Sequence, residues 1–286
     1  MNHEKNIKKA IEIESLVSLF DAHYRGSFNF PGEFHPFWEL VYVKDGLVNI
    51  SGDEKIYLLQ KGDIIFHKPM EFHRIWSADG NDIRVFISAF RAGGTAISKL
   101  EELATPLTTK QKEIIEKLTE FTKKHFPEEH GQFHQTMFEH WSDESESIQT
   151  VINLMEILLL SVSKQGSIAM KTTDKSGVSE IYREIINKLN ENVYGQITLS
   201  QLAEQCSFSV SQIKRVFAKY SDIGIHKYFI KLKIAMSIRM LGKGMSISEI
   251  SDSLSFSNQN YFSSAFKRET GLSPSEYKKR ILGIMN

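Results

Sequence analysis

The chain has 286 residues, a single cysteine and six prolines, and its 35 Lys+Arg equal its 35 Asp+Glu in number. The lone Cys206 cannot form an internal disulfide, which excludes a disulfide-stapled fold and favours a reducing compartment. Zero net charge with 41% hydrophobic residues excludes a disordered polyelectrolyte. Taken over the whole chain, this charge also argues against a nucleic-acid partner.

The sequence also lacks an apolar leader and a long hydrophobic run. Its start, MNHEKNIKKAIEIESL, is polar and carries acidic residues. The most apolar stretch, VINLMEILLL at residues 151–160, contains Asn153 and Glu156 and is far shorter than the ~20 residues that span a bilayer. We therefore expect a cytoplasmic protein.

Charge is divided unevenly along the chain. Residues 179–286 hold 15 Lys+Arg and 9 Asp+Glu, a net charge of +6, so that residues 1–178 carry −6. Nine of the ten histidines also precede residue 179. Because a whole-chain average hides such a split, nucleic acid becomes a candidate partner of the basic part. A net charge of +6 on about a hundred residues also suits an ordinary solvated surface.

The pattern of elements predicts two domains. Short segments rich in β-branched and aromatic residues cover residues 28–90, with turn signals such as Asp45-Gly46 between them. Helical spacing follows at 108–125 and 147–164. We expect an α+β protein with an all-β barrel or sandwich and flanking helices at 1–165, a polar linker at 166–178 and an all-α domain at 179–286.

The all-α domain contains an internal repeat. Residues 198–228 match residues 246–277, with Leu202 at the position of Ile250 and Phe217 at that of Phe266. Each copy has the pattern of a helix–turn–helix unit, at about 198–219 and 246–268. Thr198, Ser246, Ser209 and Ser257 are the expected N-caps. A single long helix, with a buried stripe through Tyr228, Leu232, Ala235 and Ile238, is expected to join the copies.

The second helix of each copy presents polar side chains on the face opposite its apolar one. A solvated helix face would look the same in one copy, but two copies in a basic domain favour helices that enter DNA major grooves. The expected DNA-binding residues are Ser211, Gln212, Lys214, Arg215, Gln259, Asn260, Ser263, Ser264 and Lys267.

The second copy strongly resembles the DNA-binding domain of AraC/XylS-type regulators, and the resemblance extends over about residues 180–282. The matching residues are Phe256, Tyr261, Phe262, Phe266, Lys267, Gly271, Pro274 and Tyr277. Three residues depart from the family pattern: Ser255 replaces a Gly in the turn, Ser264 a common Arg and Lys278 an Arg. The resemblance implies base reading by Ser211, Lys214 and Arg215, and more specificity in the first unit than in the second.

Residues 34–76 resemble the cupin-type sensor domain that precedes such DNA-binding domains. The matching features are His35, Glu39, Gly46, Gly62-Asp63, Pro69 and His73. This resemblance implies a small cupin-like antiparallel β-barrel that binds a small-molecule effector in its mouth. Polar groups among apolar wall residues suit that role. The expected effector-binding residues are Phe28, Phe30, His35, Phe37, Glu39, His73 and Trp76.

The polar residues of this domain admit two other interpretations. Glu33, His35, Glu39 and His73 approach the spacing of metal-binding cupins, with Glu33 in place of the first His. Hydrogen bonds from His35 or His73 that stiffen the barrel would explain the same residues. We expect effector anchoring, with no metal, cofactor or catalytic residue. His125, His130, His134 and His140 are expected to be surface histidines.

Together these features predict a sequence-specific DNA-binding transcription regulator that responds to a small-molecule effector, for which a sugar is common in the family. The helix at 147–164, apolar on nearly all sides, suggests either a homodimer or burial within one domain. RNA polymerase would be a further partner of an activator. The alternatives are a metal-dependent cupin enzyme fused to a DNA-binding module, and a DNA-binding protein whose cupin domain is only a dimerisation scaffold.

Overall fold

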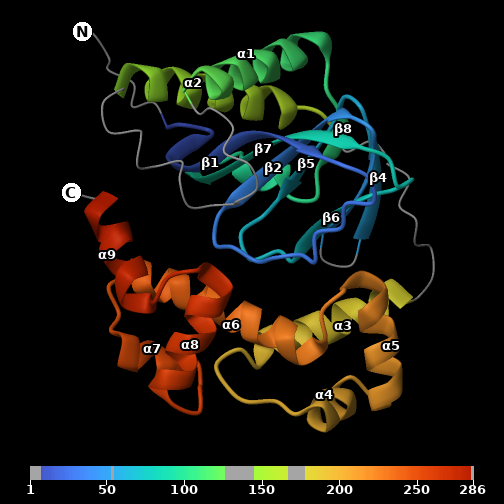
Figure 1. Ribbon diagram of the computed structural model, residues 1–286, viewed down its shortest axis with the longest axis vertical. Coiled ribbons are helices and arrows are strands. Elements are labelled where there is room, and N and C mark those ends of the chain that lie inside the picture. Colours follow the sequence, from blue (N-terminus) through green and yellow to red (C-terminus); the bar gives the residue numbers. More distant parts are fainter. Residues whose placement is uncertain (1–7, 53–54, 126–144, 167–177, 285–286) are drawn as a thin grey trace, which may run out of the picture.

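The computed structural model describes residues 8–52, 55–125, 145–166 and 178–284, so most of the expected linker, together with His130, His134, His140 and the side chain of His125, lies outside the described residues. The strand-rich N-terminal domain lies against an all-helical C-terminal domain (Figure 1). Two helices of the N-terminal domain cover its side away from the C-terminal domain (Figure 1). This arrangement is a two-domain α+β architecture.

The N-terminal domain consists of antiparallel strands in two sheets. Its strands are β1 (Glu12–Tyr24), β2 (Trp38–Asp45), β3 (Leu47–Gly52), β4 (Lys55–Gln60), β5 (Asp63–His67), β6 (His73–Ser77), β7 (Ile83–Gly93) and β8 (Ala104–Pro106). The sheet orders are β1-β7-β2-β5-β8 and β4-β3-β6. No ladder among the described residues closes these sheets into the expected barrel; they are joined instead by a shared apolar layer that includes Val43, Ile50 and Ile75.

The long first strand, β1, was not expected from the sequence. Its ladder with β7 has register shifts between Ile13 and Ser15 and between Leu16 and Ser18. Each shift moves the following side chains to the other face, so the period-2 pattern that identifies a strand is lost.

Two helices cover the outer face of the larger sheet (Figure 1). They are α1 (Thr109–His125) and α2 (Ser145–Val162), which confirm the helices expected at 108–125 and 147–164. A 3₁₀ turn, η1 (Ile97–Leu100), precedes them. Val151, Met155 and Leu158 of α2 are fully buried against the sheet, whereas Ile157 is 54% exposed. No helix among the described residues is long and apolar enough to cross a membrane.

The C-terminal domain has two apolar cores that share one long helix. Its helices are α3 (Val178–Glu191), α4 (Leu199–Gln205), α5 (Val210–Tyr220), α6 (Ile225–Gly242), α7 (Ile247–Ser253), α8 (Gln259–Thr270) and α9 (Pro274–Ile284). The expected stripe on α6 is buried, but Phe229, Ile230 and Ile234 are buried too. Helix α6 is therefore enclosed on several sides, since it contributes to both cores.

The N-caps show how the repeat is built. Thr198, Ser209 and Ser246 cap α4, α5 and α7, each within a capping box. The expected cap Ser257 is wrong: Asn258 caps α8, and its side chain accepts a hydrogen bond from the Tyr261 backbone. The one-residue insertion in the second copy moves the start of the helix to this neighbouring residue.

Candidate functional site

The second helix of each helix–turn–helix unit presents the polar face that the sequence predicts. Buried Ile213 and Phe217 anchor α5, and buried Phe262 and Phe266 anchor α8. The opposite faces are open to solvent. Ser211, Gln212, Lys214, Arg215, Gln259, Asn260, Ser264 and Lys267 are exposed, and Ser263 is half-buried.

Two of the polar residues in this domain have local structural contacts. The Gln212 side chain accepts hydrogen bonds from the backbone and hydroxyl of Ser209 at 2.9 Å, so it stabilises the start of α5. The Lys278 ammonium donates to the carbonyls of Gly244 and Met245 at 3.0 and 2.8 Å. Lys278 thus has a structural contact that supports the turn before α7.

A buried lysine joins the two units. Lys233 of α6 donates to the carbonyls of Gly195 and Leu254, both at 2.6 Å. Burial lowers the pKa of its ammonium to about 8. The Leu254 carbonyl ends α7 and Gly195 follows α3, so this one side chain holds the two halves of the domain at a fixed separation.

A cavity lies between the two sheets of the N-terminal domain. It has about 410 Å³ of space free of protein atoms, a figure that includes open solvent at its mouth. The lining residues are Phe20, Tyr24, Phe30, Glu33, Glu39, Val41, Ile50, His67, His73, Arg74, Ile75 and Ile87. Apolar and aromatic walls therefore surround a group of acidic and imidazole side chains.

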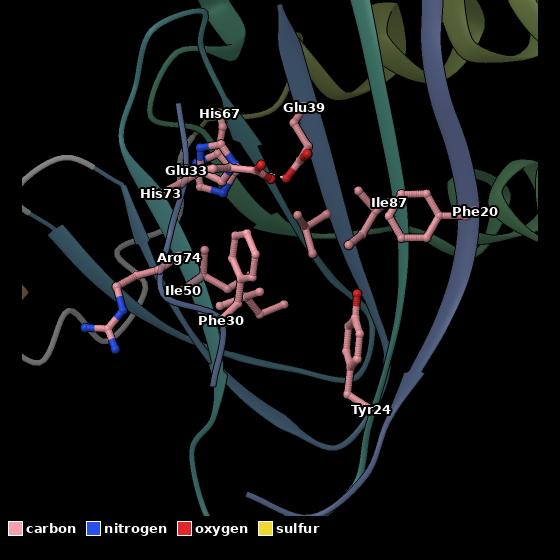
Figure 2. A pocket seen from close by; sticks show the side chains of 12 residues that line it. Phe20, Tyr24, Phe30, Glu33, Glu39, Ile50, His67, His73, Arg74 and Ile87 are labelled. Atoms are coloured by element: carbon pink, nitrogen blue, oxygen red, sulfur yellow. Dashed lines mark ion pairs between the residues drawn. The ribbon is translucent and has the colours of Figure 1, made fainter. Parts of the chain in front are cut away.

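The polar group converges at one end of the cavity. Figure 2 shows the carboxylates of Glu33 and Glu39 directed toward each other beside the imidazole of His73. The Nε2 atom of His73 lies 3.4 Å from Glu39 Oε1 and 4.0 Å from Glu33 Oε1, and His35 Nε2 lies 3.5 Å from Glu39 Oε2. His35, Glu39 and His73 are each about 95% buried.

Burial and charge oppose each other in this group. Burial alone would raise the pKa of Glu39, but the neighbouring His73 and His35 outweigh it and hold that pKa well below its usual range. Burial likewise disfavours charged His73, yet the carboxylate of Glu39 raises its pKa to about 9. The four residues Glu33, His35, Glu39 and His73 have ligand atoms within 4.8 Å of one another, so they could also hold a metal ion.

The expected effector-binding residues divide between the cavity and its surroundings. Phe30, Glu39 and His73 line the cavity. His35 reaches its polar end and stacks on Phe37 with ring centroids 4.0 Å apart, while Phe28 stacks on the cavity residue Tyr24 at 3.8 Å. Trp76 is not among the lining residues: it lies beneath Arg74 and packs against the apolar core that residues of both domains form.

Several lining residues were missed from the sequence. Phe20 and Tyr24 belong to β1, the strand that bulges conceal. His67 pairs with Glu39 across the β2–β5 ladder, so correct strand pairing would have placed it beside the expected site. Strand parity places Val41 on the same face as Glu39, although Val41 was not among the expected effector-binding residues.

The wall of the cavity is also the surface that contacts the C-terminal domain. Residues 28–35 run beside β6, where Glu33 bridges to His73, and Gly32 permits this approach because a Cβ there would lie 2.4 Å from Phe72. Phe34 lies in the first segment and Phe72 directly precedes β6. Their ring centroids lie 4.6 and 4.9 Å, respectively, from that of Tyr228 of α6.

An ion pair extends this contact. Arg74, 6% exposed, points away from the cavity centre (Figure 2) and pairs with Asp222, which follows α5. Asn29 donates to the same carboxylate at 2.9 Å and accepts from Arg74 at 3.1 Å. The residues that line the cavity are thus next to those that hold the first helix–turn–helix unit.

Comparison with known proteins matches both domains to families. The model of an AraC-like ligand binding domain matches residues 16–95, and that of a helix-turn-helix domain matches residues 202–280. The Msm operon regulatory protein of Streptococcus mutans is 29% identical over 110 residues, which are 38% of this chain and 40% of that protein. The transcriptional activator RhaR of Mannheimia succiniciproducens is 25% identical over 129 residues, 45% of each chain.

The chain thus matches less than half the length of these curated relatives. Among solved structures, ToxT of Vibrio cholerae O395 aligns over 96% of this chain and 100% of its own, with 14% identity and a TM-score of 0.43. Proteins that combine the two matched domains are transcription regulators and not enzymes. The cavity domain, the duplicated helix–turn–helix units and the two family matches show that the chain belongs to the AraC family of transcription regulators.

Proposed function

We propose that this protein is a sequence-specific DNA-binding regulator whose N-terminal domain, residues 1–165, senses a small-molecule effector. The boundary to the DNA-binding domain, 179–286, lies in the linker at 166–178. The observation that carries the proposal is the pair of capped helix–turn–helix units on one rigid helix, each with an exposed polar face. Such a pair suits two successive major grooves on one side of DNA.

Base reading is assigned mainly to the first unit. Lys214 and Arg215 stand exposed on α5, and Arg is the side chain that most often reads guanine. On α8 the matching face carries Asn260, Ser263 and Ser264, which reach less far, with Lys267 placed for a phosphate. Gln259 and Ser211 lie at the helix starts. Gln212 would leave its capping contact to join them.

The effector site is assigned to the cavity, with Glu39 and His73 at its polar end and Phe30 as apolar wall. An effector that displaces β6 or residues 28–35 changes the contacts of Phe34, Phe72 and Arg74 with the DNA-binding domain. A ligand shifts such an equilibrium by its difference in affinity for the docked and released states. The docked state described above is assigned to the inactive regulator.

A homodimer through α2 completes the proposal. Ile157 is 54% exposed on a helix whose other face is fully buried, and half-buried Leu154 and Leu160 flank it. A second copy would cover this row. Ile157→Asp should therefore yield monomers by light scattering at concentrations where the parent chain is dimeric; a parent chain that is monomeric throughout would contradict this contact.

The function is tested by DNA binding over a salt series. The full chain is titrated with promoter DNA from upstream of its own gene and with a scrambled duplex. Counterion release from phosphate contacts predicts that log K falls linearly with log salt, and that the promoter keeps an advantage at every salt concentration. A slope near zero, or equal affinity for both duplexes, would overturn the proposed function.

A further inference from the structure

The polar end of the cavity has the geometry of a metal centre. We propose that Glu33, His35, Glu39 and His73 bind one divalent first-row transition metal ion, with Zn²⁺ as the reference ion. The ligands would be the Nε2 atoms of the two imidazoles and one oxygen of each carboxylate. This binding does not depend on the proposed DNA-binding function.

Backbone carbonyls hold the Nδ1 atoms of both imidazoles, which face away from the carboxylates. His35 Nδ1 lies 3.0 Å from the carbonyl oxygen of Phe37, and His73 Nδ1 lies 3.1 Å from that of Glu71. A carbonyl can only accept, so each Nδ1 is the donor and carries the ring proton. Each Nε2 therefore faces the carboxylates, and a metal ion that displaces any proton on it would find the orientation that metal-binding histidines adopt in proteins.

The spacing of the inner atoms suits a shared ion better than direct hydrogen bonds. Charge-assisted N–H···O bonds are about 2.7–2.9 Å long. The contacts of Glu39 with His73 and His35 are 3.4 and 3.5 Å, and within the described residues neither Nε2 atom has a hydrogen-bond partner. Ligands about 2.0–2.1 Å from a tetrahedral ion are roughly 3.3–3.4 Å apart, close to these contacts.

The donor set also selects the class of ion. Two imidazole nitrogens with two carboxylates suit Zn²⁺ and its first-row neighbours, whereas Mg²⁺ and Ca²⁺ prefer oxygen ligands alone. A dication would neutralise the two carboxylates without protonating either histidine. Glu33 is the outermost ligand, with its side chain 24% exposed and 4.0 Å from His73, so it would move inward on binding.

Metal binding would reach the DNA-binding domain through Glu33. The neighbouring Phe34 packs on Tyr228, and the backbone of Glu33 pairs with that of His73. An inward shift of Glu33 therefore changes the contact that holds the first helix–turn–helix unit. This consequence rests on the proposed function, whereas metal binding itself does not.

The experiment compares the full chain with two conservative variants and a histidine control. Chelator-treated protein is dialysed against Zn²⁺ or Mg²⁺, and bound metal is measured by elemental analysis and calorimetry. We expect one Zn²⁺ and no Mg²⁺ per chain, and at least a tenfold loss of Zn²⁺ affinity in Glu33→Gln and in Glu39→Gln. His23→Ala removes an exposed histidine that pairs with Asp82 and should bind Zn²⁺ as the parent does.

The outcomes separate the site from misfolding and from other histidines. Metal-free Glu33→Gln should melt near the parent temperature, because that side chain is partly exposed, so its loss of affinity would report ligation. Zn²⁺ held elsewhere would remain in both glutamine variants, and that result overturns the proposal. Absence of Zn²⁺ from the parent chain overturns it as well, without affecting the DNA-binding test.

Discussion

The two helix–turn–helix units share one local design but have different neighbours. The core of the first unit, around Phe217 and Tyr228, includes Phe72 and Ile56 of the N-terminal domain. The core of the second unit, around Phe266, draws within the described residues on its own domain alone. The unit held by the cavity domain is also the one that presents Lys214 and Arg215. Under the proposed function, effector binding would therefore act directly on the unit to which base reading is mainly assigned.

The largest expected effect tests the division into two cores. Phe217→Ala and Phe266→Ala each remove a fully buried ring, and each should lower the free energy of unfolding by about 3–5 kcal/mol. In hydrogen exchange, Phe217→Ala should also speed exchange at residues 70–76, which pack on its core. Phe266→Ala serves as the matched control, and equal exchange at 70–76 in both variants would contradict the comparison.

The next effect concerns base reading. Arg215→Ala should weaken binding to the cognate promoter by about 1–3 kcal/mol and relax one base preference. Ser264→Ala, at the matching position of α8, should change affinity by less than about 0.5 kcal/mol, since only a short hydroxyl is lost. Both are measured by equilibrium binding at one salt concentration. If Arg215→Ala weakened binding to scrambled DNA equally, Arg215 would be a phosphate contact instead.

A smaller effect is expected at the contact between the domains. Asp222→Ala removes the partner of Arg74, a pair worth about 1 kcal/mol because Asp222 stays partly hydrated. If the docked state is inactive, effector-free protein should gain about two- to fivefold in DNA affinity. Asp252→Ala, an exposed aspartate of the second unit, is the control. Unchanged or weaker DNA binding by Asp222→Ala would contradict inhibition of DNA binding by the docked state.

The smallest effect compares the two turns. Ser207 and Ser255 both have left-handed backbones, with φ of 57° and 50°, where a residue with a Cβ costs about 1–2 kcal/mol. Ser207→Gly removes this strain but adds entropy to the unfolded chain. The net result should be a free energy of unfolding higher by about 0.5 kcal/mol. Ser255→Gly also loses a 2.7 Å hydrogen bond to the Tyr194 carbonyl, so it should bring no gain in denaturant unfolding.

Prediction from sequence succeeded where neighbours along the chain decide the structure. The repeat, three of its four caps and the exposed faces of α5 and α8 follow from helical spacing and short-range hydrogen bonds. It failed where distant segments decide. Trp76 was expected in the apolar wall of the effector site, yet it lies beneath Arg74 and packs against the core that residues of both domains form.

The sequence by itself determined the two-domain organisation, the split of charge and the duplicated DNA-binding design, because periodicity and composition are local properties. Only the tertiary structure decided that the strands form two sheets, that β1 supplies Phe20 and Tyr24 to the cavity, and that Glu33, His35, Glu39 and His73 meet. It also paired Arg74 with Asp222, 148 residues away. Strand pairing and domain docking create these contacts between segments far apart in the chain, whereas periodicity describes one segment at a time.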